Sequence, residues 1–332
     1  MLESIGKREL IALDGLGLRL QGTYHRPADR FLPGRAGRDR VGVLFVNSLS
    51  LPRAASGDSA VHWADSLAEL GYPSFRIDLP GLGDSEGEAS TNLLDRINAG
   101  GFASVTAAVA RDLTGRYGLS GVVIFGHCAG CVSAIYAGAG CGECTGLILL
   151  DPYFHLPQAK RPRVREELSA WARRSRIGRL LSNSYDSVRN LHLQLRGNGL
   201  PGNANSQLLT CWKRVAGAGV PILLLKAPGI KAHGAKPRLG EFDYIDYVVK
   251  LAGHKSQVSV EFIECADHSF ANREGREAVQ RQIERWLVLH VPPAGINFGA
   301  KDDWSLRAID NTSDSREPQA EPAGTGCALE GR

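Results

Sequence analysis

A cysteine between two closely spaced glycines is the sequence's clearest chemical signal. The segment 126–130 reads Gly-His-Cys-Ala-Gly and directly follows the apolar run 122–125. It matches the pattern Gly-x-nucleophile-x-Gly, in which a strand turns sharply into a helix and the glycines leave room for the turn. The N-terminus of such a helix favours a thiolate. We therefore predict that Cys128 is a nucleophile and that the backbone N–H of Ala129 is one oxyanion-hole donor.

The cysteines of this segment allow two other interpretations. A free cysteine often serves only as a small buried residue. Cys128 with Cys131, and Cys141 with Cys144, also form two C-x-x-C pairs, a pattern found in zinc sites. Here the first pair falls across the elbow, and a helix is expected in the short gap between the pairs. We therefore predict no metal and no cofactor.

His268 is the candidate base. It follows the expected strand 258–264 and precedes the last expected helix, 277–289, which is where a nucleophile–acid–histidine order places the base. For His127, beside the nucleophile, we favour a packing role.

The acid has two candidate positions. Asp151 ends the expected strand 146–151, whereas Glu241, Asp243 or Asp246 would approach from the loop after the next strand. We favour Asp151 because that later loop runs long before any acid occurs. If Asp151 is not the acid, it caps the turn before Pro152.

Short β-branched runs alternate with amphipathic stretches, which is typical of a mostly parallel sheet with crossover helices. The expected strands are residues 10–14, 18–25, 41–47, 74–78, 121–126, 146–151, 220–226 and 258–264. The second oxyanion donor should follow the third of them, at Ser48 or Leu49, and we favour Leu49. We predict a core of residues 1–152 and 215–290, an inserted helical cap of residues 153–214, and a disordered or loosely docked tail, 291–332.

Over roughly residues 10–290 the sequence resembles the α/β-hydrolase superfamily. Residues 75–85, Phe-Arg-Ile-Asp-Leu-Pro-Gly-Leu-Gly-Asp-Ser, are similar to a strand-and-loop signature common in these enzymes. Residues 147–151, Leu-Ile-Leu-Leu-Asp, are similar to the strand that carries the acid in the thioesterase branch. The resemblance implies the α/β-hydrolase fold, an α/β class with a mostly parallel sheet, flanking helices and an inserted helical cap, and it supports Asp151.

The cysteine elbow is similar to that of two enzyme groups in the superfamily. Dieckmann cyclases release rings from carrier proteins and take their acid after strand six, whereas dienelactone hydrolases lack a cap and take it after strand seven. The predicted architecture is more similar to the first group. The resemblance implies that Cys128 accepts an acyl group from a thioester, to cyclise or release a polyketide or peptide chain. An ester or lactone hydrolase and a non-catalytic binding protein are the alternatives.

A basic cluster lies within the predicted cap. Residues 160–179 carry eight basic side chains against two acidic ones, whereas the whole chain has a net charge of only +4. We predict that Arg163, Arg165, Arg173 and Arg174 steer an acidic acyl carrier protein or a phosphopantetheine or CoA thioester. A solvated helix face is the alternative. Stacking aromatics are too few for nucleic-acid binding.

The sequence also bears on location. The segment 1–10 lacks the apolar core of a signal peptide, and the longest apolar stretches have the length of strands. Seven cysteines without an export signal indicate reduced thiols. We predict a cytoplasmic protein that does not bind membranes.

Overall fold

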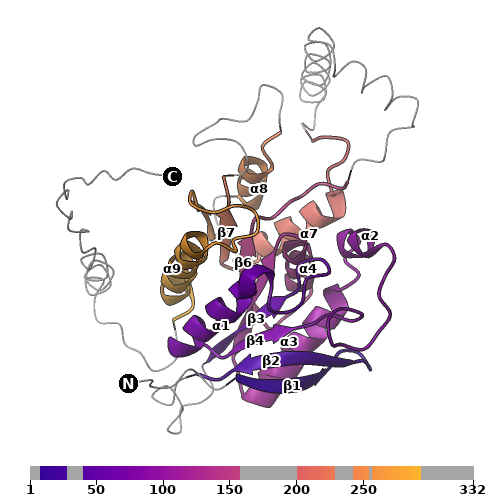
Figure 1. The fold of residues 1–332 in the computed structure, drawn as a ribbon. Helices are drawn as coiled ribbons and strands as arrows, with labels where there is room; N and C mark the ends of the chain where they lie inside the picture. The colour runs from indigo at the N-terminus through magenta and orange to yellow at the C-terminus, as the bar shows by residue number, and fades with distance from the viewer. Residues whose placement is uncertain (1–7, 28–39, 158–199, 229–241, 254–255, 293–332) are drawn as a thin grey trace, which may run out of the picture. The chain divides into compact units, whose positions relative to one another are not determined.

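The structure, a computed structural model, describes residues 8–27, 40–157, 200–228, 242–253 and 256–292. All eight expected strands are present in these ranges and form one sheet (Figure 1). The strands are β1 (Arg8–Asp14), β2 (Arg19–His25), β3 (Val41–Val46), β4 (Ser74–Ile77), β5 (Gly121–His127), β6 (Cys144–Leu150), β7 (Ile222–Lys226) and β8 (Val258–Phe262).

The sheet has the order β1-β2-β4-β3-β5-β6-β7-β8. The pairs β1–β2 and β2–β4 are antiparallel, and every pair from β4–β3 onward is parallel. The prediction of a mostly parallel α/β sheet is therefore confirmed. Because β3, β5, β6 and β7 run in one direction, the loops that follow them emerge along the same edge of the sheet.

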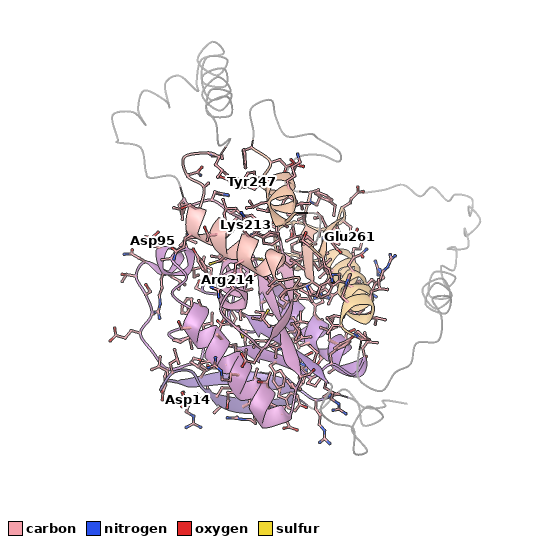
Figure 2. The ribbon with its side chains drawn as sticks, turned by 180° about the vertical axis from the view of Figure 1, so that it is seen from behind. Asp14, Asp95, Lys213, Arg214, Tyr247 and Glu261 are labelled. Atoms are coloured by element: carbon pink, nitrogen blue, oxygen red, sulfur yellow. The ribbon has the colours of Figure 1, made fainter. Side chains whose placement is uncertain are left out.

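Helices cover both faces of the sheet. They are α1 (Ser59–Glu69), α2 (Leu93–Asn98), α3 (Ala103–Tyr117), α4 (Ala129–Gly138), α7 (Ser206–Gly217), α8 (Tyr244–Ala252) and α9 (Arg273–His290), with a short 3-10 helix η2 (Ser56–Asp58). Figure 1 shows α1 and α9 on one face, and Figure 2, from behind, shows α3 and α7 on the other.

Alternation along β5 explains how one strand serves both layers. Val123 and Phe125 pack with Trp63 of α1 and Trp286 of α9 in one buried cluster. Val122 and Ile124 face the opposite cluster, which includes residues of α3, α4 and α7. Successive strand side chains point to opposite faces, so an unbroken apolar run is what a doubly covered strand needs.

The predicted cap, residues 153–214, lies largely outside the described residues, which omit 158–199. Helix α7, at the C-terminal end of the predicted cap, packs against α4, which itself packs on the sheet. The buried Trp212 on α7 donates its indole N–H to the Val248 carbonyl of α8 at 2.8 Å. On the same helix Lys213 and Arg214 are exposed (Figure 2). Residues 293–332 of the predicted tail also fall outside the described ranges.

Across the described residues, none of the helices is both long enough and apolar enough to span a membrane.

Candidate active site

Cys128 lies at the junction between β5 and α4 in an unusual backbone conformation, with φ 51° and ψ −113°. A Cβ added at Gly126 would lie 2.6 Å from the Cys131 nitrogen, and one added at Gly130 would lie 2.8 Å from the Asn47 carbonyl oxygen. Both distances are shorter than van der Waals contact allows. The two glycines of the motif are therefore required by the close approach of neighbouring backbone.

Backbone and sulfur contacts hold this elbow in place. The Cys128 N–H donates to the Leu150 carbonyl of β6 at 2.9 Å. Behind it, the buried Cys131 thiol donates to the carbonyls of Gly126 and Leu150 at 3.1 and 3.3 Å. Burial raises the pKa of Cys131, so its thiol stays protonated. Cys131 lies in the first turn of α4, whereas the second pair, Cys141 and Cys144, follows the end of that helix. The six described cysteines are free thiols.

The structure brings His268 and Asp151 together with Cys128. The Nδ1–H of His268 donates to Oδ2 of Asp151, which follows β6 at φ 52°. The Asp151 N–H donates to the Leu225 carbonyl of β7 at 2.7 Å and so fixes the backbone of the acid. Hydrogen bonds with Asp151 and then with Cys128 raise the pKa of His268 to about 10. Both neighbours therefore stabilise the imidazolium that forms when His268 takes up a proton.

Lys226, at the end of β7, is a site residue that the sequence did not reveal. Its Nζ donates to Oδ1 of Asp151, the carboxylate oxygen that His268 does not use. Burial acts to raise the pKa of Asp151, but the hydrogen bonds from His268 and Lys226 outweigh it and lower that pKa. The sequence did contain a signal for this contact, because Lys226 ends an apolar run that is expected to pair with the strand before Asp151.

The other candidate acids lie elsewhere or outside the described residues. Asp243 caps the start of α8, where it accepts from the N–H groups of Ile245 and Asp246 at 2.9 and 3.0 Å. Asp246 pairs with Lys250 one helical turn later, at 2.6 Å. Glu241 lies outside the described ranges. Among the described candidates, Asp151 is the acid that contacts His268.

The loop that carries His268 is a compact turn. Oδ1 of Asp267 accepts from the N–H groups of Ser269 and Phe270 at 2.9 and 3.2 Å, and from the Ser269 hydroxyl at 2.6 Å. Phe270 is fully buried and adopts φ 50°, which anchors the turn against the core. The turn leaves the His268 side chain 59% exposed.

The loop after β3 lies on the other side of the elbow. Leu49 has φ 50° and is 39% exposed, and the Leu51 N–H closes a turn onto the Ser48 carbonyl at 3.0 Å. Ala129 begins α4, and the first N–H groups of a helix have no partner within it. Their assignment as oxyanion donors stays a prediction.

A buried carboxylate that the sequence did not single out fixes this loop. Asp78, fully buried after β4, accepts through Oδ1 from Asn47 Nδ2 at 3.0 Å and from the Arg53 N–H at 2.9 Å. Asn47 Nδ2 also donates to the Leu51 carbonyl at 2.9 Å. A Cβ at Gly83 would lie 2.6 Å from Asp78 Oδ1, which explains one glycine of the 75–85 segment. The network joins the loops after β3 and β4.

The sequence model of the alpha/beta hydrolase family matches residues 31–281. No curated protein sequence matches the chain.

Several solved structures share the fold. DcsB, solved with its substrate analogue, is 15% identical, with a TM-score of 0.54, and the match covers 86% of this chain and 100% of DcsB. An esterase of Pyrococcus furiosus is 13% identical, with a TM-score of 0.56, over 86% and 92% of the two chains. A dienelactone hydrolase of Anabaena variabilis is 15% identical, with a TM-score of 0.52, over 86% and 99%. At these identities the likeness shows the fold alone.

Proposed function

The chain belongs to the alpha/beta hydrolase family, and from this premise we propose that it is an acyl-transferring enzyme with Cys128 as its nucleophile. His268 is the base in this proposal, and Asp151 orients it. The observation that carries the proposal is the hydrogen bond from His268 to Asp151, together with the proximity of Cys128, which lies at the end of a strand–helix elbow and also raises the pKa of His268. A base held by an acid and bonded to a thiol is the arrangement that nucleophilic catalysis needs.

The reaction has two steps. The Cys128 thiol gives its proton to His268, and the sulfur attacks the acyl carbon. The N–H groups of Ala129 and Leu49 donate to the resulting oxyanion. The oxyanion collapses, the bond to the leaving group breaks, and the His268 imidazolium gives it a proton. A second nucleophile, either water or a group within the acyl chain, then loses its proton to His268 and displaces the Cys128 sulfur.

We propose a thioester as the substrate, with cyclisation or release of a polyketide or peptide chain from a carrier protein. Exchange between a thiol and a thioester is nearly isoenergetic, and the acyl-cysteine remains reactive towards carbon or nitrogen. The contact of the acid after β6 with His268 supports this over the dienelactone type, which takes its acid after strand seven. A cytoplasmic location belongs to the same proposal, and the free thiols of the six cysteines in the described ranges support it.

An ester or lactone hydrolase is the second candidate. The fold is shared with an esterase and a dienelactone hydrolase, so hydrolysis is supported by the related structures about as well as acyl transfer from a carrier. The two candidates differ in the acceptor of the second step, which is water in the hydrolase and an internal nucleophile in the cyclase.

Cys128→Ser should separate the two candidates. An oxygen ester is a poorer acyl donor to carbon or nitrogen than a thioester, so the serine form of a cyclase should stall as an acyl-enzyme or shift towards hydrolysis. The measurement is intact-protein mass together with product mass, after reaction with N-acetylcysteamine thioesters that carry a β-ketoacyl amide chain. Hydrolysed acid as the sole product of the wild-type enzyme would favour the hydrolase.

The carrier interaction remains a proposal about residues outside the described ranges. Arg163, Arg165, Arg173 and Arg174 changed together to Glu should raise the apparent KM for a carrier-bound substrate by about tenfold or more. The N-acetylcysteamine thioester of the same acyl group should react at nearly the wild-type rate. Equal losses on both substrates would instead assign these residues to the acyl pocket, and no loss on either would make the cluster a solvated face.

A further inference from the structure

His127, the residue before the nucleophile, contacts the backbone of the candidate base. Its Nε2 lies 2.8 Å from the carbonyl oxygen of His268. A carbonyl oxygen only accepts hydrogen bonds, so Nε2 carries the proton and donates it. This bond joins the end of β5 to the loop after β8, at two positions that are 141 apart in the sequence.

The surroundings of His127 argue against a role in packing alone. The residue is 6% exposed, and its ring packs against His268 and edge-on against Phe270, with centroids 5.5 and 5.6 Å apart. Its Nδ1 is buried and has no hydrogen-bond partner among the described residues. An apolar side chain would fill the same space without burying an unpaired nitrogen. The hydrogen bond to His268 is thus the contact that a histidine supplies here and an apolar residue does not.

We propose that His127 is a positioning residue that holds the base over the nucleophile, an inference that rests on the proposed function. His268 lies in the loop after β8, an edge strand that pairs with β7 on one side only. Asp151 fixes the imidazole of His268, and His127 fixes its carbonyl. Because His127 precedes Cys128 directly, any movement of the elbow carries the base loop with it.

The charge states of His127 and His268 are consistent with the hydrogen bond between them. The titratable groups near His127 are His268 and Asp151, on the two neighbouring loops. Burial, with the nearby His268, lowers the pKa of His127 and keeps its ring neutral. A neutral ring protonated at Nε2 donates to the carbonyl without placing a second positive charge beside the imidazolium of His268.

Two variants of similar size test the proposal. Gln at position 127 places an amide N–H near the position of Nε2, whereas Met removes the donor. The probe is p-nitrophenyl acetate, and the readout is the rate constant and half-saturation concentration of the p-nitrophenolate burst that accompanies acylation of Cys128. We expect His127→Met to lower the rate constant about tenfold, as loss of one hydrogen bond predicts, with half-saturation unchanged. His127→Gln should stay within about threefold of wild type.

A second readout is independent of the substrate. The low-field proton resonance of His268 Nδ1–H, bonded to Asp151, should persist in wild type and His127→Gln. It should broaden through solvent exchange in His127→Met. If the Met variant does not fold, His127→Phe keeps a ring and lacks the donor. Wild-type bursts and resonances in the folded donor-free variant would overturn the proposal, as would a Gln variant that behaves like Met. A burst retained by Cys128→Ala would instead overturn the proposed function and leave the resonance test standing.

Discussion

Replacing Cys128 by alanine should abolish turnover and lower kcat/KM by about 10⁴-fold or more. Without the sulfur, no covalent acyl-enzyme forms, and His268 loses the group it activates. The fold should survive, because the elbow is held by backbone hydrogen bonds and by its two glycines rather than by the thiol. The measurements are kcat/KM on an acyl thioester, intact-protein mass for an acyl adduct, and thermal unfolding.

Cys265 provides the matched control. It is an exposed free thiol three residues before His268, so Cys265→Ala removes a thiol near the base without touching the elbow. This variant should keep wild-type turnover and a single acyl adduct. Substantial turnover in Cys128→Ala would remove the cysteine mechanism, and a wild-type protein that never becomes acylated would favour a binding protein.

Asp151→Asn should lower kcat/KM by about 10²- to 10⁴-fold. The neutral amide no longer stabilises the imidazolium of His268, and it favours the wrong tautomer of the ring. Asparagine should leave the backbone unchanged, because it tolerates the positive φ of 52° that Asp151 adopts. Asp243→Asn is the matched control, because an amide oxygen can still cap α8 and this residue does not contact His268.

The stability of Asp151→Asn gives this prediction a pH dependence. The pKa of His268 is raised from 6.5 to about 10, chiefly by Asp151. A raised pKa contributes stability that is complete below about pH 6.5 and is lost as the pH rises through about 10. The difference in unfolding free energy between wild type and Asp151→Asn should therefore be larger at pH 6 than at pH 10. Urea denaturation at both values measures it, and a difference independent of pH would contradict the ion pair.

The sequence was sufficient for the fold because the central strands β3, β5, β6 and β7 are short, mainly apolar runs. The four apolar residues 122–125 predict a strand that is buried on both faces. The Gly-x-Cys-x-Gly motif that follows can be recognised from neighbouring residues alone. The placement of Cys128, Asp151 and His268 was also accessible, since chain order and strand ends limit the choices. Their catalytic roles stay predictions.

Contacts between loops that are distant in the sequence were not accessible in the same way. Lys226 contacts Asp151 because β6 and β7 are neighbours, and His127 at the end of β5 contacts the carbonyl of His268 in the loop after β8. The packing role favoured for His127 from the sequence omits this hydrogen bond. Asp78 gains its position from the approach of two loops, which no local pattern of residue types encodes.

The backbone conformations around the site have a consequence for engineering this protein. Of seven described non-glycine residues with positive φ, four lie in the loops around the elbow: Leu49, Cys128, Asp151 and Phe270. Each such conformation costs on the order of 1–3 kcal/mol unless neighbouring structure compensates. Selection for thermostability should therefore find favourable changes in these loops, such as glycine at Leu49, and those changes would relax the geometry that the triad requires. Screens for thermostable variants of this protein should therefore measure activity from the first round.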